Sequence, residues 1–529
     1  MASSSFVTID YLVFFVYIAL IIFMGLWVSR SKKQKRTSQD YFLASKSLTW
    51  WAIGASLIAA NISAEQMIGM SGSGYVIGLG IASYEWMAAI TLILVGKFFL
   101  PIFIEKKIYT MPQFLEQRYD GRVRIAMAAF WLLVYVFVNL TSVLYLGALA
   151  LNTIMGVPLL WGIIGLAAFA AVYSIYGGLK SVAWTDVIQV VVLVGGGLIT
   201  AWLSLKAVSN GEGAIRGFSL LLEQAPEKFD MILDRNHPAY QELPGIGVIL
   251  GGMWIANISY WGFNQYIIQR GLAAKNIREA QRGVLFAGYL KLLIPVIVVV
   301  PGIAAFVITQ GDPSMINPPD QAYPWLLHNF VPAGIKGLAF AALTAAIVSS
   351  LASMLNSTST IFTMDIYTNY IRKDASENQL VFIGRLTSVV ALVIAVITAR
   401  PLLGGLDQAF QYIQEFTGFV TPGVCAIFLM GFFWKKTSAN AALWSAILTI
   451  PLSFVFKWLT PRLPFLDRMG LVFLLIVLIA VVISGYDNKK KSDPKAVVLY
   501  KGLFYTDHRF NLAAIGIGII CAVLYILFW

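Results

Sequence analysis

The sequence predicts an all-α integral membrane protein with about fourteen transmembrane helices. Three observations lead to this fold class. Of the 529 residues, 59% are hydrophobic and only 12% are charged, whereas soluble domains carry roughly 25% charged residues. The mean hydropathy is +0.77. Long apolar runs recur along the whole chain, and each is long enough to form a helix that crosses a bilayer.

The individual spans follow from the apolar runs, since a crossing needs about 20 predominantly apolar residues. They are predicted at roughly 7–29, 49–72, 80–104, 123–149, 157–176, 184–206, 244–268, 283–309, 334–366, 379–399, 406–433, 438–459, 469–485 and 510–528. The first run is too long for a secretory signal, and no Lys or Arg precedes it. We therefore expect it to remain as a helix.

The basic residues predict how these spans are oriented. The cluster RSKKQKR (30–36) directly follows the first run. Lys and Arg collect in cytoplasmic loops, so the N-terminus is predicted to lie outside. Fourteen spans then place most of the 38 Lys and Arg residues in inside loops and leave both termini outside. These loops explain the net charge of +12, which therefore does not indicate nucleic acid binding.

Two further features of the chain limit its chemistry. Cys425 and Cys521 lie inside apolar runs and are expected to be small core residues, neither forming a disulfide nor binding a metal. The three histidines lie in polar stretches without metal-ligand spacing. No nucleophile–base arrangement occurs in the spans, so the protein is not expected to be an enzyme. In the long external loop 207–243, residues 219–233 have the periodicity of a short surface helix.

Polar and ionisable residues occur where a lipid-facing helix would be apolar. The stretch LIAANISAEQ (57–66) places Asn61, Glu65 and Gln66 in the second span, and Glu85 and Lys291 lie in the third and eighth. A charged residue at bilayer depth costs at least about 2.5–3.5 kcal/mol. Such residues persist when they face a cavity or one another, which predicts a polar solute path.

The string Ala-Asn-Ile-Ser occurs at 60–63 and again at 256–259, in the second and seventh spans. These spans are five apart, so the two copies run in opposite directions through the membrane. That is the arrangement of an inverted repeat whose first helices are broken. Carbonyls freed at a break, with the hydroxyls of Ser349 and Ser350, favour a hard alkali or alkaline-earth cation.

Several stretches resemble the sodium:solute symporter family, in particular its bacterial sodium/galactose and sodium/glucose cotransporters. They are ASLIAANISAEQMIGMSGSGY (55–75), SYEWM (83–87), YSIYGGLKSVAWTDVIQ (173–189), YWGFNQYIIQR (260–270), AAIVSSLASMLNSTSTIFTMDIY (345–367) and FQYIQEFTG (410–418). The resemblance covers essentially the whole chain. It implies a leucine-transporter-like core of ten helices in two inverted five-helix repeats, with one helix before the core and three after it.

The predicted organisation follows from that resemblance and from the span count. It comprises an N-terminal helix with a basic loop (1–48), a first repeat (49–206), an external loop (207–243), a second repeat (244–433) and three C-terminal helices (434–529). The resemblance also implies a bacterial cell membrane location and sodium as the coupling ion, with a sugar and the lipid bilayer as further partners. The oligomeric state stays open.

Matching the motifs residue by residue gives the expected site. The side chains that match the family's sugar contacts are Asn61, Gln66, Glu85, Asn257, Lys291 and Gln414, and Tyr260 with Trp261 matches its aromatic inner gate. The sodium site would use the carbonyls of Ala59, Ile62 and Ala346 and the hydroxyls of Ser349 and Ser350. Asp186 resembles an acid on the sodium exit route. Ala88 stands where some relatives have a serine.

The residue types support a neutral sugar independently, because amide, carboxylate and ammonium groups pair with hydroxyls and aromatic rings pack on the C–H faces of a pyranose. Other cargoes of the same family, such as inositol, sialic acid or proline, remain alternatives. A proton-coupled symporter also stays open. A channel is disfavoured, since selectivity filters are built from repeated loops or subunits.

Overall fold

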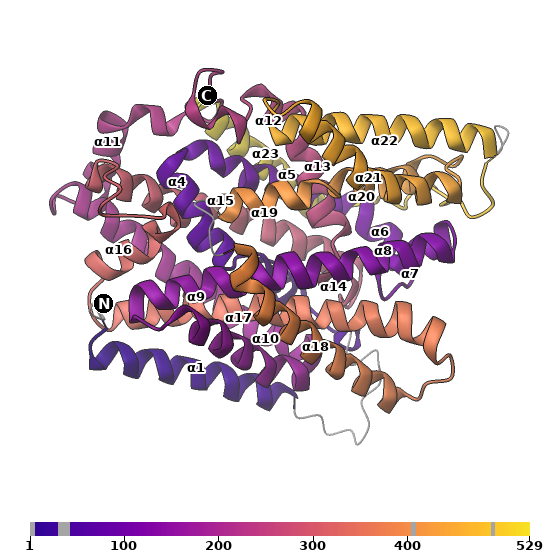
Figure 1. The fold of residues 1–529 in the computed structure, drawn as a ribbon, viewed down its shortest axis with the longest axis horizontal. Coiled ribbons are helices and arrows are strands. Elements are labelled where there is room, and N and C mark those ends of the chain that lie inside the picture. The colour runs from indigo at the N-terminus through magenta and orange to yellow at the C-terminus, as the bar shows by residue number, and fades with distance from the viewer. Residues whose placement is uncertain (1–5, 30–42, 404–408, 488–491) are drawn as a thin grey trace.

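The computed structural model is all-helical over the residues that it describes, which are 6–29, 43–403, 409–487 and 492–529 (Figure 1). Within those residues there is no β-strand, and the β-type pairing is a single bridge between Leu48 and Ala274. The predicted fold class is therefore confirmed. The basic cluster at 30–36 lies outside the described residues.

Ten helical segments of the described chain are long and apolar enough to cross a membrane, and a bent helix pair makes an eleventh. The ten are Thr8–Gly25, Leu79–Glu105, Gly121–Met155, Ser181–Val208, Ile277–Thr309, Ile335–Ile371, Glu377–Leu403, Ala439–Leu459, Phe465–Asp487 and His508–Leu527. The bent pair, Pro238–Leu250 with Gly252–Phe263, turns by 79°. This count is lower than the predicted fourteen because the second, fifth and eleventh spans are broken or short.

Those three spans are still helical. The second consists of α3 (Trp50–Asn61), a π-helical segment η2 (Glu65–Met70) and α4 (Ser71–Val76). The eleventh is divided into α19 (Ala409–Gly418) and α20 (Thr421–Phe433). The fifth and sixth were expected as separate helices, but both lie in α10 (Leu159–Val208). No proline interrupts the chain between them, so the helical hydrogen bonding continues.

The remaining helices connect and surround these elements. The first membrane helix is α1 (Thr8–Ser29). The seventh predicted span contains α12 (Ile246–Leu250), α13 (Gly252–Ile258), η8 (Ser259–Phe263) and α14 (Gln265–Leu272). The longer elements among the rest are, in chain order, α5 (Ser83–Leu94), α6 (Leu100–Glu105), α7 (Met111–Arg118), α8 (Gly121–Val134), η5 (Tyr135–Leu140), α9 (Thr141–Met155), α11 (Ala214–Gln224), α15 (Ile277–Thr309), α16 (Ala322–Phe330), α17 (Ile335–Ile361), η10 (Phe362–Ile371), α18 (Glu377–Leu403), α21 (Ala439–Leu459), α22 (Phe465–Asp487) and α23 (His508–Leu527).

The loop 207–243 contains the expected surface helix at a different place. The prediction was 219–233, whereas α11 covers Ala214–Gln224. The helix ends before Pro226 because proline has no amide for a helical hydrogen bond. In Figure 1 the N-terminus, α11 and α16 lie toward one end of the long axis and α7 toward the other.

The helices differ sharply in burial. In Ile335–Ile371, which contains α17, 94% of the most apolar stretch is buried, against 17% in α23. The central helices therefore form the core, and α1, α22 and α23 expose apolar side chains such as Phe23 and Leu474, as lipid contact requires.

One contact in the core brings two backbones together. A Cβ atom added to Gly74 of α4 would lie 2.9 Å from the Val299 carbonyl oxygen of α15, and one added to Gly302 would lie 2.2 Å from the Ser71 carbonyl oxygen. Real Cβ atoms do not approach that closely, so glycine is required at both positions. This glycine contact seats α4 directly on α15.

Candidate substrate cavity and cation site

The first broken helix is interrupted immediately after Asn61. Ile62 has an extended ψ of 99°, and its amide donates to Ile58 O at 2.7 Å as the last helical bond of α3. The next amide, that of Ser63, donates to the side-chain Oε1 of Gln66 at 3.2 Å. It therefore makes no helical bond to Ala59, and the final carbonyls of α3 are available to other partners. The predicted break in the second span is confirmed.

The second broken helix is interrupted at Asn264, where φ is −79° and ψ is 125°. The predicted break in the seventh span is therefore confirmed, and the Ala-Asn-Ile-Ser copy at 256–259 precedes it. The copy lies inside the helical run of α13 and η8. In the first helix the same string contains the break itself, so the two copies are not equivalent positions of the repeat.

A cavity of about 440 Å³ lies between the two broken helices, α5, α15 and α19. All eight side chains predicted to contact the solute line this cavity. They are Asn61, Gln66, Glu85, Asn257, Tyr260, Trp261, Lys291 and Gln414. Four lining residues were not predicted as solute contacts: Glu65, Tyr84, Ala256 and Phe410.

Lys291 organises the charged side of this cavity. It is fully buried, and its Nζ donates hydrogen bonds to Glu85 Oε2 and Asn61 Oδ1. The same Nζ lies 4.9 Å from the centroid of the Trp261 ring, which is within the range of a cation–π contact. A buried charge needs a partner and hydrogen bonds, and here the lysine and the glutamate neutralise each other.

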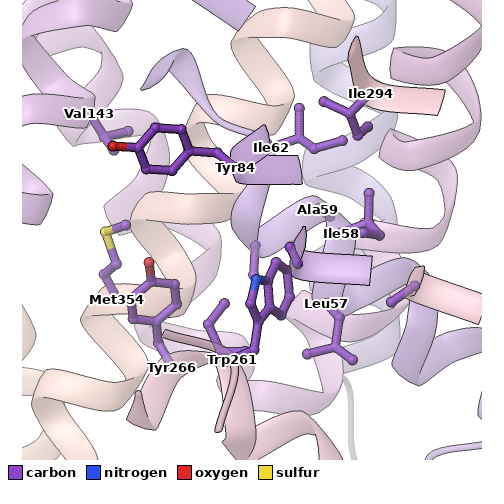
Figure 2. Packing of buried hydrophobic residues seen from close by; sticks show 14 of the residues in the cluster. Leu57, Ile58, Ala59, Ile62, Tyr84, Val143, Trp261, Tyr266, Ile294 and Met354 are labelled. Carbon is purple, nitrogen blue, oxygen red and sulfur yellow. The ribbon is translucent and has the colours of Figure 1, made fainter. Parts of the chain in front are cut away.

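Tyr260 links the two broken helices. Asn61 Nδ2 donates to the Tyr260 hydroxyl at 3.0 Å, and the Tyr266 hydroxyl donates to the same oxygen at 2.7 Å. The Tyr260 and Trp261 rings are edge to face at 5.2 Å. Figure 2 shows Trp261 and Tyr266 in the lower part of the view and Tyr84 in the upper part, with Ile62 of the first broken helix beside Tyr84.

The amide side chains of the cavity differ in their partners. Gln66 Oε1 accepts from the Ser63 amide and hydroxyl, and Asn257 Nδ2 donates to Met253 O at 3.2 Å. Gln414 also lines an adjoining cavity of about 800 Å³. Glu65 lines both cavities and accepts from Ser142 Oγ at 2.7 Å. Its partner lies 77 positions away, so no local sequence signal identified this contact.

The predicted sodium ligands are brought together in part. Ser350 Oγ donates toward the carbonyls of Ala59, at 3.2 Å, and Ala60, at 3.1 Å. Ala60 was not predicted. Ile62 and Ala346, which are close in sequence to these groups, are both fully buried. Ser349 instead donates to Asp186 Oδ1. A hydroxyl facing two carbonyls at the end of a helix is an all-oxygen set that suits a hard cation.

Asp186 lies inside the helix bundle and not at its surface. It is fully buried and accepts from Ser349 on α17 and Ser56 on α3. Arg270 of α14 is also fully buried and places its guanidinium 3.6 Å from Asp186 Oδ2. The carboxylate therefore joins the cation ligands to both broken helices, and a role in ion exit stays a prediction.

Comparison with known proteins gives one consistent group. Residues 41–449 match the model of the sodium:solute symporter family. The chain is 56% identical to a sodium/glucose cotransporter from Vibrio parahaemolyticus over 98% of both chains. It is 35% identical to the human sodium/myo-inositol cotransporter 2, over 86% of this chain and 71% of the relative.

Solved structures agree in fold. A sodium-coupled sialic acid symporter in a substrate-bound, outward-open state matches with a TM-score of 0.78 and 26% identity, over 91% of this chain and 98% of the other. The transporter Mhp1 in a closed conformation matches with a TM-score of 0.55 and 14% identity, over 90% and 99%. The latter identity is low enough that only the fold is informative.

Proposed function

The chain belongs to the sodium:solute symporter family, and from that premise we propose that it imports a neutral monosaccharide together with sodium. Membership makes it a multi-pass membrane transporter and confirms two predictions: the protein is not an enzyme, and sodium is its coupling ion. The sugar, the direction of transport and the roles of individual residues belong to the proposal.

The observation that carries the proposal is the polar network around Asn61. This side chain ends α3, accepts from Lys291 and donates to Tyr260 within the cavity. Two residues before it, the Ala59 carbonyl faces Ser350. One broken helix therefore supplies a side chain to the solute and a backbone oxygen to the cation.

Chemistry favours a sugar as the solute. The hydroxyls of a pyranose replace the mutual hydrogen bonds of Glu85, Lys291 and Gln66, which offer both donors and acceptors, while Trp261 and Tyr260 provide aromatic surface. The carboxylate and ammonium already neutralise each other, so a neutral molecule leaves the charge balance of the pair unchanged. The similarity to the sodium/glucose cotransporter supports the same choice.

Sodium binding and sugar binding are coupled because both ligands contact the first broken helix. Sodium at Ala59 and Ser350 stabilises the interrupted shape of α3 and η2, and that shape holds Asn61 and Gln66 toward the sugar. The two ligands thereby strengthen each other's binding, typically by about 1–3 kcal/mol in such coupled sites. We place the protein in the bacterial inner membrane with both termini outside, as the distribution of basic residues predicts.

The test is uptake of radiolabelled galactose into proteoliposomes with an imposed sodium gradient, for the wild type and Gln66→Ala. We expect sodium-driven uptake in the wild type, competition by glucose, and at least tenfold slower uptake in the variant. myo-Inositol is the second solute to test, because a relative named for it is 35% identical. Absence of sodium-driven uptake for all three solutes would refute the sugar proposal and leave the family assignment intact.

A further inference from the structure

The inner half of the second broken helix, α14, carries three fully buried polar side chains: Gln265, Gln269 and Arg270. Each is paired with another element. Gln269 Oε1 accepts from Ser357 Oγ of α17 at 2.8 Å, and Arg270 Nε donates to Ser56 O of α3 at 2.9 Å. Since unpaired buried polar groups are costly, these contacts fix where α14 lies.

Gln265 makes the contact nearest to the break. Its Oε1 accepts from the Met111 amide at 2.8 Å, and its Nε2 donates to the Tyr109 carbonyl at 3.1 Å. Both ends of one side-chain amide thus pair with the main chain two residues apart. Gln265 directly follows Asn264, the residue that interrupts the helix.

The segment 109–111 is in turn anchored to other helices. Thr110 Oγ1 donates to Asp365 Oδ1 at 3.0 Å, and Arg124 Nε of α8 donates to the same oxygen at 2.8 Å. Asp365 is fully buried in η10, the continuation of α17. Residues 109–111 are therefore held in place by other helices, and α14 is hydrogen bonded to them through Gln265.

On the other side of the break, η8 carries the aromatic pair of the cavity. Asn264 is a single extended residue between η8 and α14, so a rotation there moves α14 relative to Tyr260 and Trp261. The Tyr266 hydroxyl of α14 also bonds Tyr260. Releasing α14 would therefore loosen the wall of the cavity on the side of the basic loops.

We propose that Gln265 is a positioning residue of transport: its amide pins α14 to residues 109–111 and keeps the second broken helix closed on the side of the basic loops. The inference rests on the proposed function for its place in a transport cycle. Its test measures solvent access and needs neither sugar nor sodium flux.

The test is the rate at which a thiol in the cavity reacts from the side of the basic loops. The parent carries Cys425→Ala and Cys521→Ala, which replace the two buried native cysteines, and Ser259→Cys, whose position lines the adjoining cavity. A membrane-impermeant methanethiosulfonate reagent is added to inside-out vesicles. Gln265→Met keeps an unbranched side chain of similar length but removes both hydrogen bonds. We expect its labelling to be about tenfold faster than the parent's, which corresponds to about 1.4 kcal/mol.

Gln113→Ala is the matched control. Gln113 Oε1 accepts from the Tyr109 amide at 2.8 Å, so this change removes a hydrogen bond of the same segment without touching α14. Its labelling rate is expected to stay within twofold of the parent's. Gln265→Glu is expected to resemble Gln265→Met, because a carboxylate oxygen would face the Tyr109 carbonyl.

Two results would overturn the inference: a parental labelling rate in Gln265→Met, or an equal acceleration in Gln113→Ala. If no sugar is taken up by the wild type but Gln265→Met is still labelled faster, the proposed solute is wrong and the positioning role stands.

Discussion

The two broken helices differ in the hydrogen bonds that the groups at their breaks make. At Ile62 the first helix leaves the carbonyls of Ala59 and Ala60 to a serine hydroxyl. At the second break the groups of Asn264 itself are paired: its carbonyl accepts from the Ile267 and Ile268 amides of α14, and the Tyr135 hydroxyl donates to its side chain. A break whose carbonyls face a side-chain hydroxyl suits ion binding, because all these ligand atoms are oxygens. A break at which the single extended residue is held by hydrogen bonds suits a hinge. The sequence copies shared by the two helices do not predict this difference.

The largest effect is expected from Lys291→Ala, which removes the cation beside the first helix. Glu85 would be left buried without its partner, and breaking a buried pair in this way costs about 3–5 kcal/mol. We expect sodium-driven uptake, normalised to the amount of protein, to fall at least hundredfold.

The control for that variant is Lys457→Ala. Lys457 pairs with Glu415 at 3.0 Å but is 41% exposed, and exposed pairs contribute only about 0.2–1 kcal/mol. Uptake should stay within threefold. An equal loss in both variants would show that the buried pair has no special role in the cavity.

Ser350→Ala tests whether sodium binds at the break in the first helix. It removes the hydroxyl that faces the Ala59 and Ala60 carbonyls. The sodium concentration for half-maximal uptake is expected to rise about tenfold, with little change in the maximal rate at saturating sodium. Ser388→Ala is the control, since Ser388 bonds Gly384 O of its own helix and Leu355 O. An unchanged sodium dependence in Ser350→Ala would remove the contrast between the two breaks.

Tyr260→Phe tests the direct link between the two helices. The variant keeps the ring but loses the hydroxyl that accepts from Asn61 and Tyr266. A neutral hydrogen bond contributes about 0.5–1.5 kcal/mol, so sugar affinity measured by equilibrium binding in sodium should weaken about fivefold. Tyr17→Phe should leave affinity unchanged, because no described residue provides a hydrogen-bond partner for the buried Tyr17 hydroxyl. Equal affinities in wild type and Tyr260→Phe would contradict the link.

The smallest effect is expected at a partly exposed ion pair between Arg282, on the helix of Lys291, and Asp507, which precedes α23. Asp507 accepts from the Phe510 amide and pairs with Arg282 at 2.9 Å, and these contacts, the amide first, hold its pKa below the ordinary value of 3.8. A lowered pKa stabilises the fold above the unfolded value, and the contribution is lost as the pH falls through the folded value.

Thermal unfolding of wild type and Asp507→Asn between pH 3 and 7 measures this contribution. The difference at pH 7 should be below about 1 kcal/mol, as for caps and exposed pairs, and should become smaller as the pH falls toward 3. A gap that is constant over this range would show that the carboxylate charge does not contribute.

The sequence predicted the cavity because polar residues are conspicuous in apolar spans. Asn61, Glu85 and Lys291 stood out by chemistry alone, and each does line the cavity. The family motifs added Asn257 and Gln414, whose amides have no such contrast with their neighbours. Contacts between residues far apart in the sequence were not predictable. Examples are the hydrogen bonds of Glu65 with Ser142 and of Asp186 with Ser349.

Irregular backbone was the other feature that the sequence hid. The π-helical segments η2, η5 and η8 keep a helical pattern of side chains, so periodicity does not reveal them. For the same reason the position of the break at Asn264 was not predicted from the sequence. The division of the chain into two repeats and flanking helices remains a prediction.

The glycine contact between α4 and α15 has a consequence for redesigning specificity. Because Gly74 and Gly302 seat the two backbones against each other, the wall that carries Gln66 and Lys291 has no room to adjust to a solute of another shape. A larger or differently hydroxylated cargo would have to be accommodated by the opposite wall. Libraries that vary Asn257 and Gln414 should therefore yield new selectivities more readily than those that vary Gln66.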